Sequence, residues 1–411
     1  MSDPIDPAVR PVVVMKFGGT SVATTEGRAA IARRVLEAAE LGRAPVVVVS
    51  AMGRAGAPYA TDTLLSLVDG LPTEPRERDL LASCGELISA VVVAHELRAA
   101  GVTARAFTGA EAGIGTDGIH GDASITDVHP GPLQRALADG AVPVVAGFQG
   151  MAADGSTTTL GRGGSDTTAC ALGVALGAEA VEIYTDVDGV MSADPRTCDG
   201  AEVLDVIRAD ELFQMARAGA RIVHTPAAEL ALASGLSVRV RNTYTDHPGT
   251  LVADIASYTP STVGTAVTCA GGIARLRVSL QADEGADGHM NSQTRVYRAM
   301  ADAGVSLDMF TPAGETLLFT VAQGSLEAAC ATLTALALPY EVTPSLAKVT
   351  LVGAAMHGVP GVMATMAEHL AAAGVDVLQT ADSHTTISVL VSSADADTAV
   401  DALHEGFGLG S

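Results

Sequence analysis

The sequence predicts an α/β domain with a mainly parallel sheet, followed by a duplicated pair of small strand-and-helix units. Two observations lead to this prediction. Up to about residue 255, apolar runs of strand length alternate with longer Ala-rich stretches of helical character. This alternation is typical of parallel strands joined by crossover helices. Beyond that point the strands become shorter, and the sequence repeats itself at an offset of 70 residues.

The elements of the first domain follow one another in a regular order. The expected strands are short runs rich in Val, Ile and Ala at Val12–Phe17, Pro45–Ser50, Ala104–Thr108, Val142–Phe148, Ala180–Thr185 and Ser237–Arg241. The expected helices lie near Gly27–Leu41, Glu77–Ala99, Leu133–Ala138, Thr167–Leu176 and Ala209–Gly219. Ligands bind such sheets at the carboxyl ends of the strands. The glycine-rich loops after the strands are therefore where we expect the chemistry.

The C-terminal region contains two copies of a strand–helix–strand–strand unit. Ala303-Gly304-Val305 recurs as Ala373-Gly374-Val375, and Thr316–Val321 recurs as Thr386–Val391. One copy is too small to bury much core, so we expect the copies to pack against each other or across a dimer. The predicted domains are residues 1–255, 263–337 and 345–411.

Composition excludes several classes of protein. The chain has 411 residues, with 24 Lys and Arg against 47 Asp and Glu, which gives a formal charge of −23. This charge disfavours nucleic acid and anionic membrane surfaces as partners. No apolar run reaches the length of about 18 residues that a membrane-spanning helix needs, and the polar N-terminus does not resemble a signal peptide. The five cysteines are widely spaced, without a CxxC motif, so we expect a reduced, cytoplasmic chain without a zinc site.

Lysine is rare among the basic residues. Only Lys16 and Lys348 are lysines, whereas the other 22 of the 24 basic residues are arginines. Lysine is a compact charge on a flexible stem and arginine is a planar fork, so a retained lysine points weakly to a site that needs lysine. For Lys348 the simpler interpretation is a solvated cation at the start of a strand.

The loop that contains Lys16 has the features of a phosphate-binding loop. Lys16-Phe17-Gly18-Gly19-Thr20-Ser21 follows a predicted strand and precedes a helix. The glycines let the backbone approach an anion, and successive N–H groups with a helix N-terminus favour negative charge. The Walker A pattern GxxxxGK[ST] is absent from the chain. The alternative interpretation is a turn with an incidental lysine.

Three further segments carry charged residues in positions suited to ligands. The glycine-rich loop Gly161–Thr168 contains Arg162, which could bind a carboxylate bidentately, and Asp166, which could hold a metal or orient a cation. Thr185–Arg196 is an acidic, turn-rich segment that ends in an arginine suited to a nucleotide phosphate. Glu86 stands at a glycine break in a helical region and is suited to a substrate ammonium. Taken singly, each could also be an ordinary loop or helix-surface residue.

Together these motifs resemble the aspartate kinase (aspartokinase) family, which has the amino acid kinase fold. The likeness runs from about Val12 to Leu409, and the duplicated unit resembles the paired ACT domains of that family. The resemblance implies an α/β three-layer sandwich with a mainly parallel sheet, followed by two ferredoxin-like ACT domains. The matching strings are Lys16–Ser21, Val49–Gly53, Gly85-Glu86, Phe107–Gly109, Ala146–Gly150, Thr158–Thr168 and Thr185–Arg196.

The resemblance also implies an activity and a set of site residues. The activity is ATP-dependent phosphorylation of the side-chain carboxylate of L-aspartate to 4-phospho-L-aspartate, with Mg²⁺ brought in by ATP and feedback control by an amino acid at the ACT domains. The implied catalytic residues are Lys16 and Asp166. The implied substrate-binding residues are Ser50, Thr61, Glu86, Arg162, Gly163, Gly164 and Ser165. The implied nucleotide-binding residues are Lys16, Phe17, Gly18, Gly19, Thr185, Asp186, Met191, Arg196 and Arg221.

Two alternatives to this function remain open at the level of sequence. One is another amino acid kinase, such as a glutamate 5-kinase or an acetylglutamate kinase. The other is a catalytically silent protein that only senses amino acids. Glu86 with Arg162 and the two ACT-like units argue against the first. The presence together of Lys16, Glu86, Arg162 and Asp166 argues against the second, because a sensor has no use for this combination.

Some positions depart from the family pattern. Arg221 stands where the family commonly has lysine, and the loop Gly53–Ala60 is longer than in many members. That loop, together with Leu378–Thr386, looks most like the diaminopimelate-sensitive aspartokinase I of bacilli. By the same resemblance, Asp283–Gly288 is the effector-binding loop of the first ACT-like unit. This loop lacks the Pro-Gly pair that is common in lysine-sensitive members of the family. We therefore expect an effector that is not simply lysine plus threonine, and a dimer formed through the ACT domains.

Overall fold

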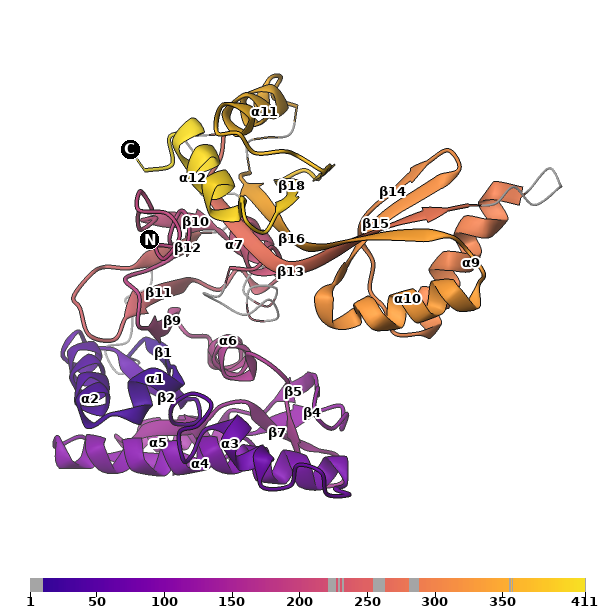
Figure 1. The fold of residues 1–411 in the computed structure, drawn as a ribbon. Coiled ribbons are helices and arrows are strands. Elements are labelled where there is room, and N and C mark those ends of the chain that lie inside the picture. Colours follow the sequence, from indigo (N-terminus) through magenta and orange to yellow (C-terminus); the bar gives the residue numbers. More distant parts are fainter. Residues whose placement is uncertain are drawn as a thin grey trace, which may run out of the picture. The chain divides into compact units, whose positions relative to one another are not determined.

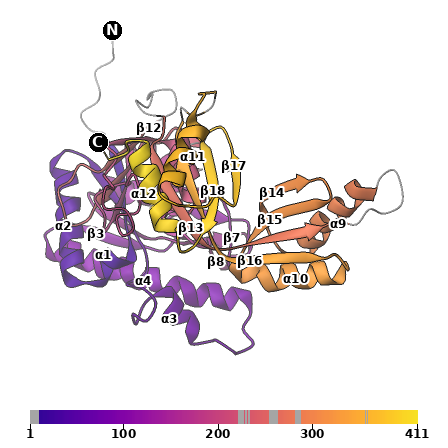
Figure 2. The ribbon, with the colours of Figure 1, turned by 45° about the horizontal axis from the view of Figure 1, so that its top comes forward.

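The computed structural model describes residues 10–220, 227, 230, 233–253, 263–280, 288–354, 356 and 358–410 (Figures 1 and 2). The chain forms two compact units. The first unit comprises residues 10–190, together with residues 203–216 and the described part of 221–259. The second comprises residues 191–202, 217–220 and the described part of 260–411. Arg221 and most of the loop Asp283–Gly288 lie outside the described residues.

The first unit is built on an eight-stranded sheet with the strand order β10-β12-β11-β9-β1-β2-β6-β3. Every neighbouring pair is parallel except β11 with β12. The predicted, mainly parallel sheet is therefore confirmed. Its strands are β1 (Val12–Phe17), β2 (Ala44–Val49), β3 (Ala104–Phe107), β6 (Val142–Ala146), β9 (Ala180–Thr185), β10 (Val206–Arg208), β11 (Val238–Asn242) and β12 (Thr250–Ala253).

Helices cover both faces of this sheet. In β1, Val13 and Met15 belong to a core that also contains side chains of α2 and α4. Successive strand residues point to opposite faces, so the fully buried Val14 lies on the other face, and α6 packs against β1. The result is the predicted three-layer sandwich. The helices of this unit are α1 (Gly19–Ala23), α2 (Thr25–Glu40), α3 (Thr61–Ser66), α4 (Pro75–Ala99), α5 (Gly131–Ala138), α6 (Gly164–Leu176) and α7 (Ala209–Arg217).

A second, smaller sheet was not predicted. Its strand order is β5-β4-β7-β8. The predicted single strand Val142–Phe148 is wrong in its extent, because β6 ends at Ala146 and Phe148 takes a left-handed conformation with φ 69° before β7 starts. The strands are β4 (Ile114–Thr116), β5 (Ile125–Val128), β7 (Gln149–Ala152) and β8 (Thr157–Thr159).

Helix α4 is a core helix of the first unit. Among the described residues it is the one helix long and apolar enough to cross a membrane, but half of its most apolar window is buried inside the protein. The predicted break at Gly85 is wrong, since α4 continues through it. A Cβ at Gly85 would lie 2.7 Å from the Cβ of Ala51, so glycine allows the helix to approach the loop after β2.

The second unit is a six-stranded antiparallel sheet with the order β14-β15-β13-β16-β18-β17. Its strands are β13 (Ala266–Ser279), β14 (Asp308–Ala313), β15 (Thr316–Ala322), β16 (Tyr340–Val352), β17 (Gln379–Asp382) and β18 (Thr386–Ser392). Its helices are α9 (Gly288–Asp302), α10 (Leu326–Ala335), α11 (Val362–Ala372) and α12 (Ala396–Gly406), with a short 3-10 turn at Gln323–Ser325.

The internal repeat is visible in this unit. Strands β15 and β18 begin at Thr316 and Thr386, which are 70 residues apart, and each repeat has its own hydrophobic core. Strand β13 runs through both cores, because Val267 packs in the core of the second repeat and Leu276 in that of the first. Figure 2 shows α9 and α10 beside β14 and β15, and α11 and α12 beside β18.

Two local features of the second unit bear on the sequence predictions. The segment Met191–Glu202 belongs to it, and Ser192 Oγ lies 2.8 Å from His404 Nε2. Lys348 does not open a strand as predicted. It lies within β16, and its Nζ is paired with the carboxylate of Asp308 on β14.

Candidate active site

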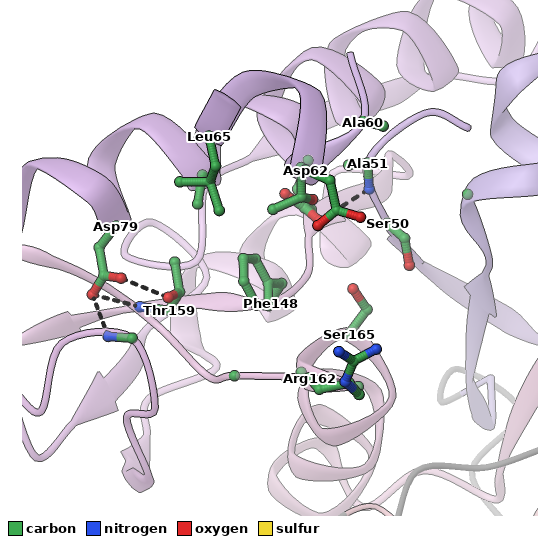
Figure 3. A pocket seen from close by; sticks show the side chains of 18 of the residues that line it. Ser50, Ala51, Ala60, Asp62, Leu65, Asp79, Phe148, Thr159, Arg162 and Ser165 are labelled. Carbon is green, nitrogen blue, oxygen red and sulfur yellow. Dashed lines mark hydrogen bonds between the residues drawn. The ribbon is translucent and has the colours of Figure 1, made fainter. Parts of the chain in front are cut away.

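A cavity of about 690 Å³ opens in the first unit, where β1 and β2 end and α6 begins (Figure 3). This is the edge of a parallel sheet at which ligands are expected. It brings together residues from segments far apart in the sequence. The predicted site residues that line it are Lys16, Gly19, Ser50, Thr61, Glu86, Arg162, Gly163, Gly164, Ser165 and Asp166.

Lys16 and Asp166 form an ion pair in this cavity. Lys16 is near the end of β1, and Asp166 lies in the first turn of α6. The Nζ of Lys16 is 2.7 Å from Oδ1 of Asp166, and the two side chains are only 13% and 11% exposed. The carboxylate therefore holds the ammonium in one place at the cavity wall, where it can stabilise a bound anion.

Two glycines shape the loops around this pair. A Cβ at Gly19 would lie 2.5 Å from the carbonyl oxygen of Ala51, so only glycine lets the loop after β1 pack on the loop after β2. The N–H of Gly53 donates to the oxygen of Gly19 and fixes this contact. Gly163 precedes α6 with φ 71°, a left-handed conformation that turns the chain into the helix.

Glu86 is a buried carboxylate with an unsatisfied oxygen. The side chain lines the cavity from α4, and the residue is 3% exposed. Its Oε1 accepts a hydrogen bond from the N–H of Ala51, whereas Oε2 has no hydrogen-bond partner among the described residues. Burial disfavours the charged form and raises the pKa of Glu86 to about 7. A cationic group of a ligand would satisfy the free oxygen and restore the charged form.

Arg162 and Ser165 approach the cavity from another side. Figure 3 shows both at the start of α6, with Ser50, Ala51 and Asp62 across the cavity from them. The cavity thus contains a guanidinium suited to a carboxylate and a carboxylate suited to an ammonium. This arrangement can bind both polar groups of an α-amino acid while Lys16 faces an anion beside it.

Comparison with known proteins assigns the family. Residues 11–242 match the model of the amino acid kinase family, and residues 341–405 match an ACT domain. The chain is 46% identical over 403 residues to aspartokinase 1 of Bacillus subtilis, covering 97% of this chain and 99% of that protein. The chain belongs to the aspartokinase family.

Solved structures of the family share the fold over almost the whole chain. The crystal structure of E. coli aspartokinase III with aspartate and ADP in the R-state matches with a TM-score of 0.78 and 26% identity, over 97% of this chain and 100% of that one. The T-state structure of the same enzyme with lysine and aspartate matches with a TM-score of 0.76 and 26% identity, over 96% and 99% of the two chains. These matches do not favour the alternative that the chain is a catalytically silent amino-acid sensor.

The residues predicted to bind the nucleotide are less closely gathered at the cavity than those predicted to bind the substrate: of the former, Lys16 and Gly19 line it. Phe17 is fully buried and stacks on Tyr184 with ring centroids 4.7 Å apart, so only its backbone could face a nucleotide. The N–H of Gly18 donates to the oxygen of Tyr184. Thr185 ends β9, and Asp186 is paired with Arg54 at 3.2 Å.

Neither Met191 nor Arg196, also predicted for the nucleotide, lines this cavity. Met191 and Arg196 belong to the second unit, where Arg196 is paired with Asp194. Arg221 lies outside the described residues. Their role toward the nucleotide stays a prediction.

Sequence reasoning missed several residues that line the cavity. Asp79, His120, Phe148 and Thr159 all contribute to the wall. Asp79 had a detectable signal, since it lies seven residues before Glu86 and residues at that spacing share a helix face. Phe148 and Thr159 lie in or beside the small sheet, whose strands are too short to stand out in the sequence.

Proposed function

We propose that this protein transfers the γ-phosphoryl group of ATP to the side-chain carboxylate of L-aspartate, giving 4-phospho-L-aspartate and ADP. Membership of the aspartokinase family supports the reaction. We further propose that it serves as a cytoplasmic enzyme at the entry to the pathways from aspartate to lysine, threonine, methionine and diaminopimelate.

One observation carries the choice of acceptor. Within the part of the chain that the structure describes, the buried Oε2 of Glu86 has no hydrogen-bond partner, and Glu86 lines the same cavity as Arg162 and Lys16. An acceptor with an ammonium, an α-carboxylate and a second carboxylate satisfies all three groups. Glu86 would bind the ammonium, Arg162 the α-carboxylate, and the second carboxylate would then point toward Lys16. Ser50, Thr61 and Ser165 line the same cavity and would complete the acceptor site with Gly163 and Gly164.

The chemistry requires positioning and charge stabilisation more than acid–base catalysis. An oxygen of the side-chain carboxylate attacks the γ-phosphorus, the new O–P bond forms, and the bond to the departing ADP oxygen breaks. The carboxylate is already ionised near neutral pH, so no general base is needed. Lys16 stabilises negative charge on the transferring group, and Asp166 keeps the ammonium in place.

The cavity wall is suited to phosphates on the Lys16 side. A Cβ at Gly18 would lie 3.9 Å from Nζ of Lys16, so its absence leaves room for an anion beside the ammonium. Lys16 and Gly19 line the cavity and would bind the phosphates, whereas the N–H of Gly18 already donates to the oxygen of Tyr184 and Phe17 lies within β1, so for these two residues the nucleotide contact stays a prediction. Mg²⁺ would arrive with ATP, because this ion keeps much of its water and binds mainly through substrate phosphates in kinases.

We also propose that the second unit binds an amino-acid effector and forms a homodimer. The ACT match and the duplicated sheet support this role. The structure of E. coli aspartokinase III with lysine shows an amino-acid effector in a relative. Thermal shifts with lysine, threonine, methionine and meso-diaminopimelate would identify the ligand, since a ligand that binds only the folded state raises the melting temperature.

The activity is tested by measuring ADP release and acyl phosphate formation in parallel. Hydroxylamine converts an acyl phosphate to a hydroxamate, which separates transfer to a carboxylate from simple ATP hydrolysis. We expect hydroxamate with L-aspartate, little with L-glutamate and none without an acceptor. Turnover with glutamate alone would identify a different amino acid kinase, and no turnover with either would leave only the sensor interpretation.

A further inference from the structure

Asp79 is a buried carboxylate that accepts four hydrogen bonds. It lies in α4 and is 3% exposed. Its Oδ1 accepts from the hydroxyl of Thr159 at 2.7 Å. Its Oδ2 accepts from Nδ1 of His120 at 2.8 Å and from the N–H groups of Gly121 and Thr159, each at 3.1 Å. Figure 3 shows the dashed lines from Asp79 to Thr159. One carboxylate thus accepts hydrogen bonds from two separate segments of the chain.

Both of these segments adjoin Arg162. Thr159 ends β8, and Arg162 follows it by three residues. The loop from His120 packs on the same stretch, because a Cβ at Gly161 would lie 2.5 Å from Oδ1 of Asp122. The N–H of Ala123 donates to the oxygen of Thr159 at 2.9 Å and closes this contact. Asp79 therefore anchors the chain immediately before Arg162.

The same helix carries Glu86 seven residues later, about 10.5 Å along the axis at 1.5 Å per residue. Glu86 ties α4 to the loop after β2 through the N–H of Ala51. Between the two carboxylates, the oxygen of Ser83 accepts from Nε2 of Gln149, which pairs with Thr159 across β7 and β8. Helix α4 therefore connects Glu86 directly to the segment that presents Arg162.

We propose that Asp79 is a positioning residue for the acceptor substrate, which fixes Arg162 at the distance from Glu86 that an α-amino acid requires. The proposal rests on the proposed function, in which these two residues bind the α-carboxylate and the ammonium. Asp79 itself need not touch the substrate. A carboxylate suits a site where four donors converge, because both of its oxygens accept hydrogen bonds, whereas an amide has only one acceptor oxygen.

The test is a double-mutant cycle between Asp79 and Arg162, with KM for aspartate as the readout. Misplacement of a binding group costs roughly 10-fold or more in substrate binding. We expect Asp79→Ala to raise KM for aspartate by about this factor while kcat changes less, since Arg162 binds substrate and transition state alike. In an Arg162→Ala background, Asp79→Ala should add less than about twofold, because the residue through which it acts is gone.

Three measurements separate positioning from loss of folding. Asp79→Asn keeps one oxygen for the backbone donors but cannot accept all four hydrogen bonds, so it should raise KM for aspartate by less than Asp79→Ala does. Asp154→Ala removes an exposed carboxylate from the turn between β7 and β8 of the same sheet. Among the described residues Asp154 hydrogen-bonds only with Ser156, so this variant should leave KM for aspartate unchanged. Far-UV circular dichroism at the assay temperature shows whether Asp79→Ala is folded.

Several results would overturn the proposal. These are an unchanged KM for aspartate, an equal rise in KM for ATP, or a full effect of Asp79→Ala in the Arg162→Ala background. If Asp79→Ala does not fold, the cycle uses Asp79→Asn in its place. Additive effects of Asp79→Asn and Arg162→Ala on KM for aspartate would then overturn the proposal. Failure of the wild-type protein to phosphorylate aspartate would instead refute the proposed function.

Discussion

The two lysines of the chain each pair with an aspartate, but their surroundings differ. Lys16 and Asp166 are 13% and 11% exposed and face the cavity of the first unit. Lys348 and Asp308 lie on the sheet of the second unit, where the lysine side chain is 17% exposed but that of its partner Asp308 is 57% exposed. Solvent screens the second pair far more than the first. The rarity of lysine alone therefore does not distinguish a functional cation from a structural one; the burial of the partner carboxylate and the neighbouring cavity do.

The largest expected effect comes from exchanging Lys16 for arginine. Lys16→Arg should lower kcat by about 10²-fold or more, because a planar guanidinium cannot take the place of a compact ammonium at the transferring phosphoryl group. Lys348→Arg is the matched control and should leave kcat within about twofold, since arginine can keep an exposed ion pair with Asp308. Steady-state rates of ADP release measure both. Near-normal turnover of Lys16→Arg would remove the contrast between the pairs.

The next effect tests the acceptor site beside Lys16. Arg162→Ala should raise KM for aspartate by about 10-fold or more, because a charge-assisted contact to the α-carboxylate is lost. KM for ATP should change little. Arg105, which lies on β3 and forms an exposed pair with Asp139, provides the control: Arg105→Ala should have no effect on either constant. An unchanged KM for aspartate in Arg162→Ala would place the carboxylate contact elsewhere.

A smaller effect should appear in the pH dependence, through Glu86. Burial raises the pKa of this carboxyl to about 7 in the protein without ligand, and binding of an ammonium needs the ionised form. As pH falls through about 7, kcat/KM for aspartate should fall, approaching about tenfold per pH unit below it. At saturating aspartate, kcat should stay flat to lower pH, because the bound ammonium lowers the pKa of Glu86. Glu86→Gln should flatten the profile, and a wild-type profile that is flat from pH 8 to 6 would contradict the assignment.

The features recoverable from sequence were those with strong local signals. The parallel sheet was predictable because β1, β2, β6 and β9 are near-continuous apolar runs, as expected for strands covered on both faces. Lys16, Glu86, Arg162 and Asp166 were predictable because they stand in glycine-rich or family-specific strings. The structure then showed that these strings converge on one cavity.

The features that escaped prediction depend on tertiary contact. Gly85 looked like a helix break, because glycine is a poor helix former, yet the close approach of Ala51 selects it within α4. Asp79 belongs to no recognisable sequence motif. The four groups that donate hydrogen bonds to it come from segments about 40 and 80 residues away in sequence. Lys348 looked like a solvated strand end, because its partner Asp308 is 40 residues distant.

The smallest expected effect concerns the stability of the exposed pair. Asp308→Asn removes the charge opposite Lys348 but keeps an oxygen that can accept from the N–H of Met309. The loss should therefore be under about 1 kcal/mol of unfolding free energy and should shrink further in high salt. Urea denaturation at low and high ionic strength measures it. A loss of several kcal/mol, insensitive to salt, would mean that Lys348 is held as tightly as Lys16, and the distinction between the two pairs would then have to rest on the cavity alone.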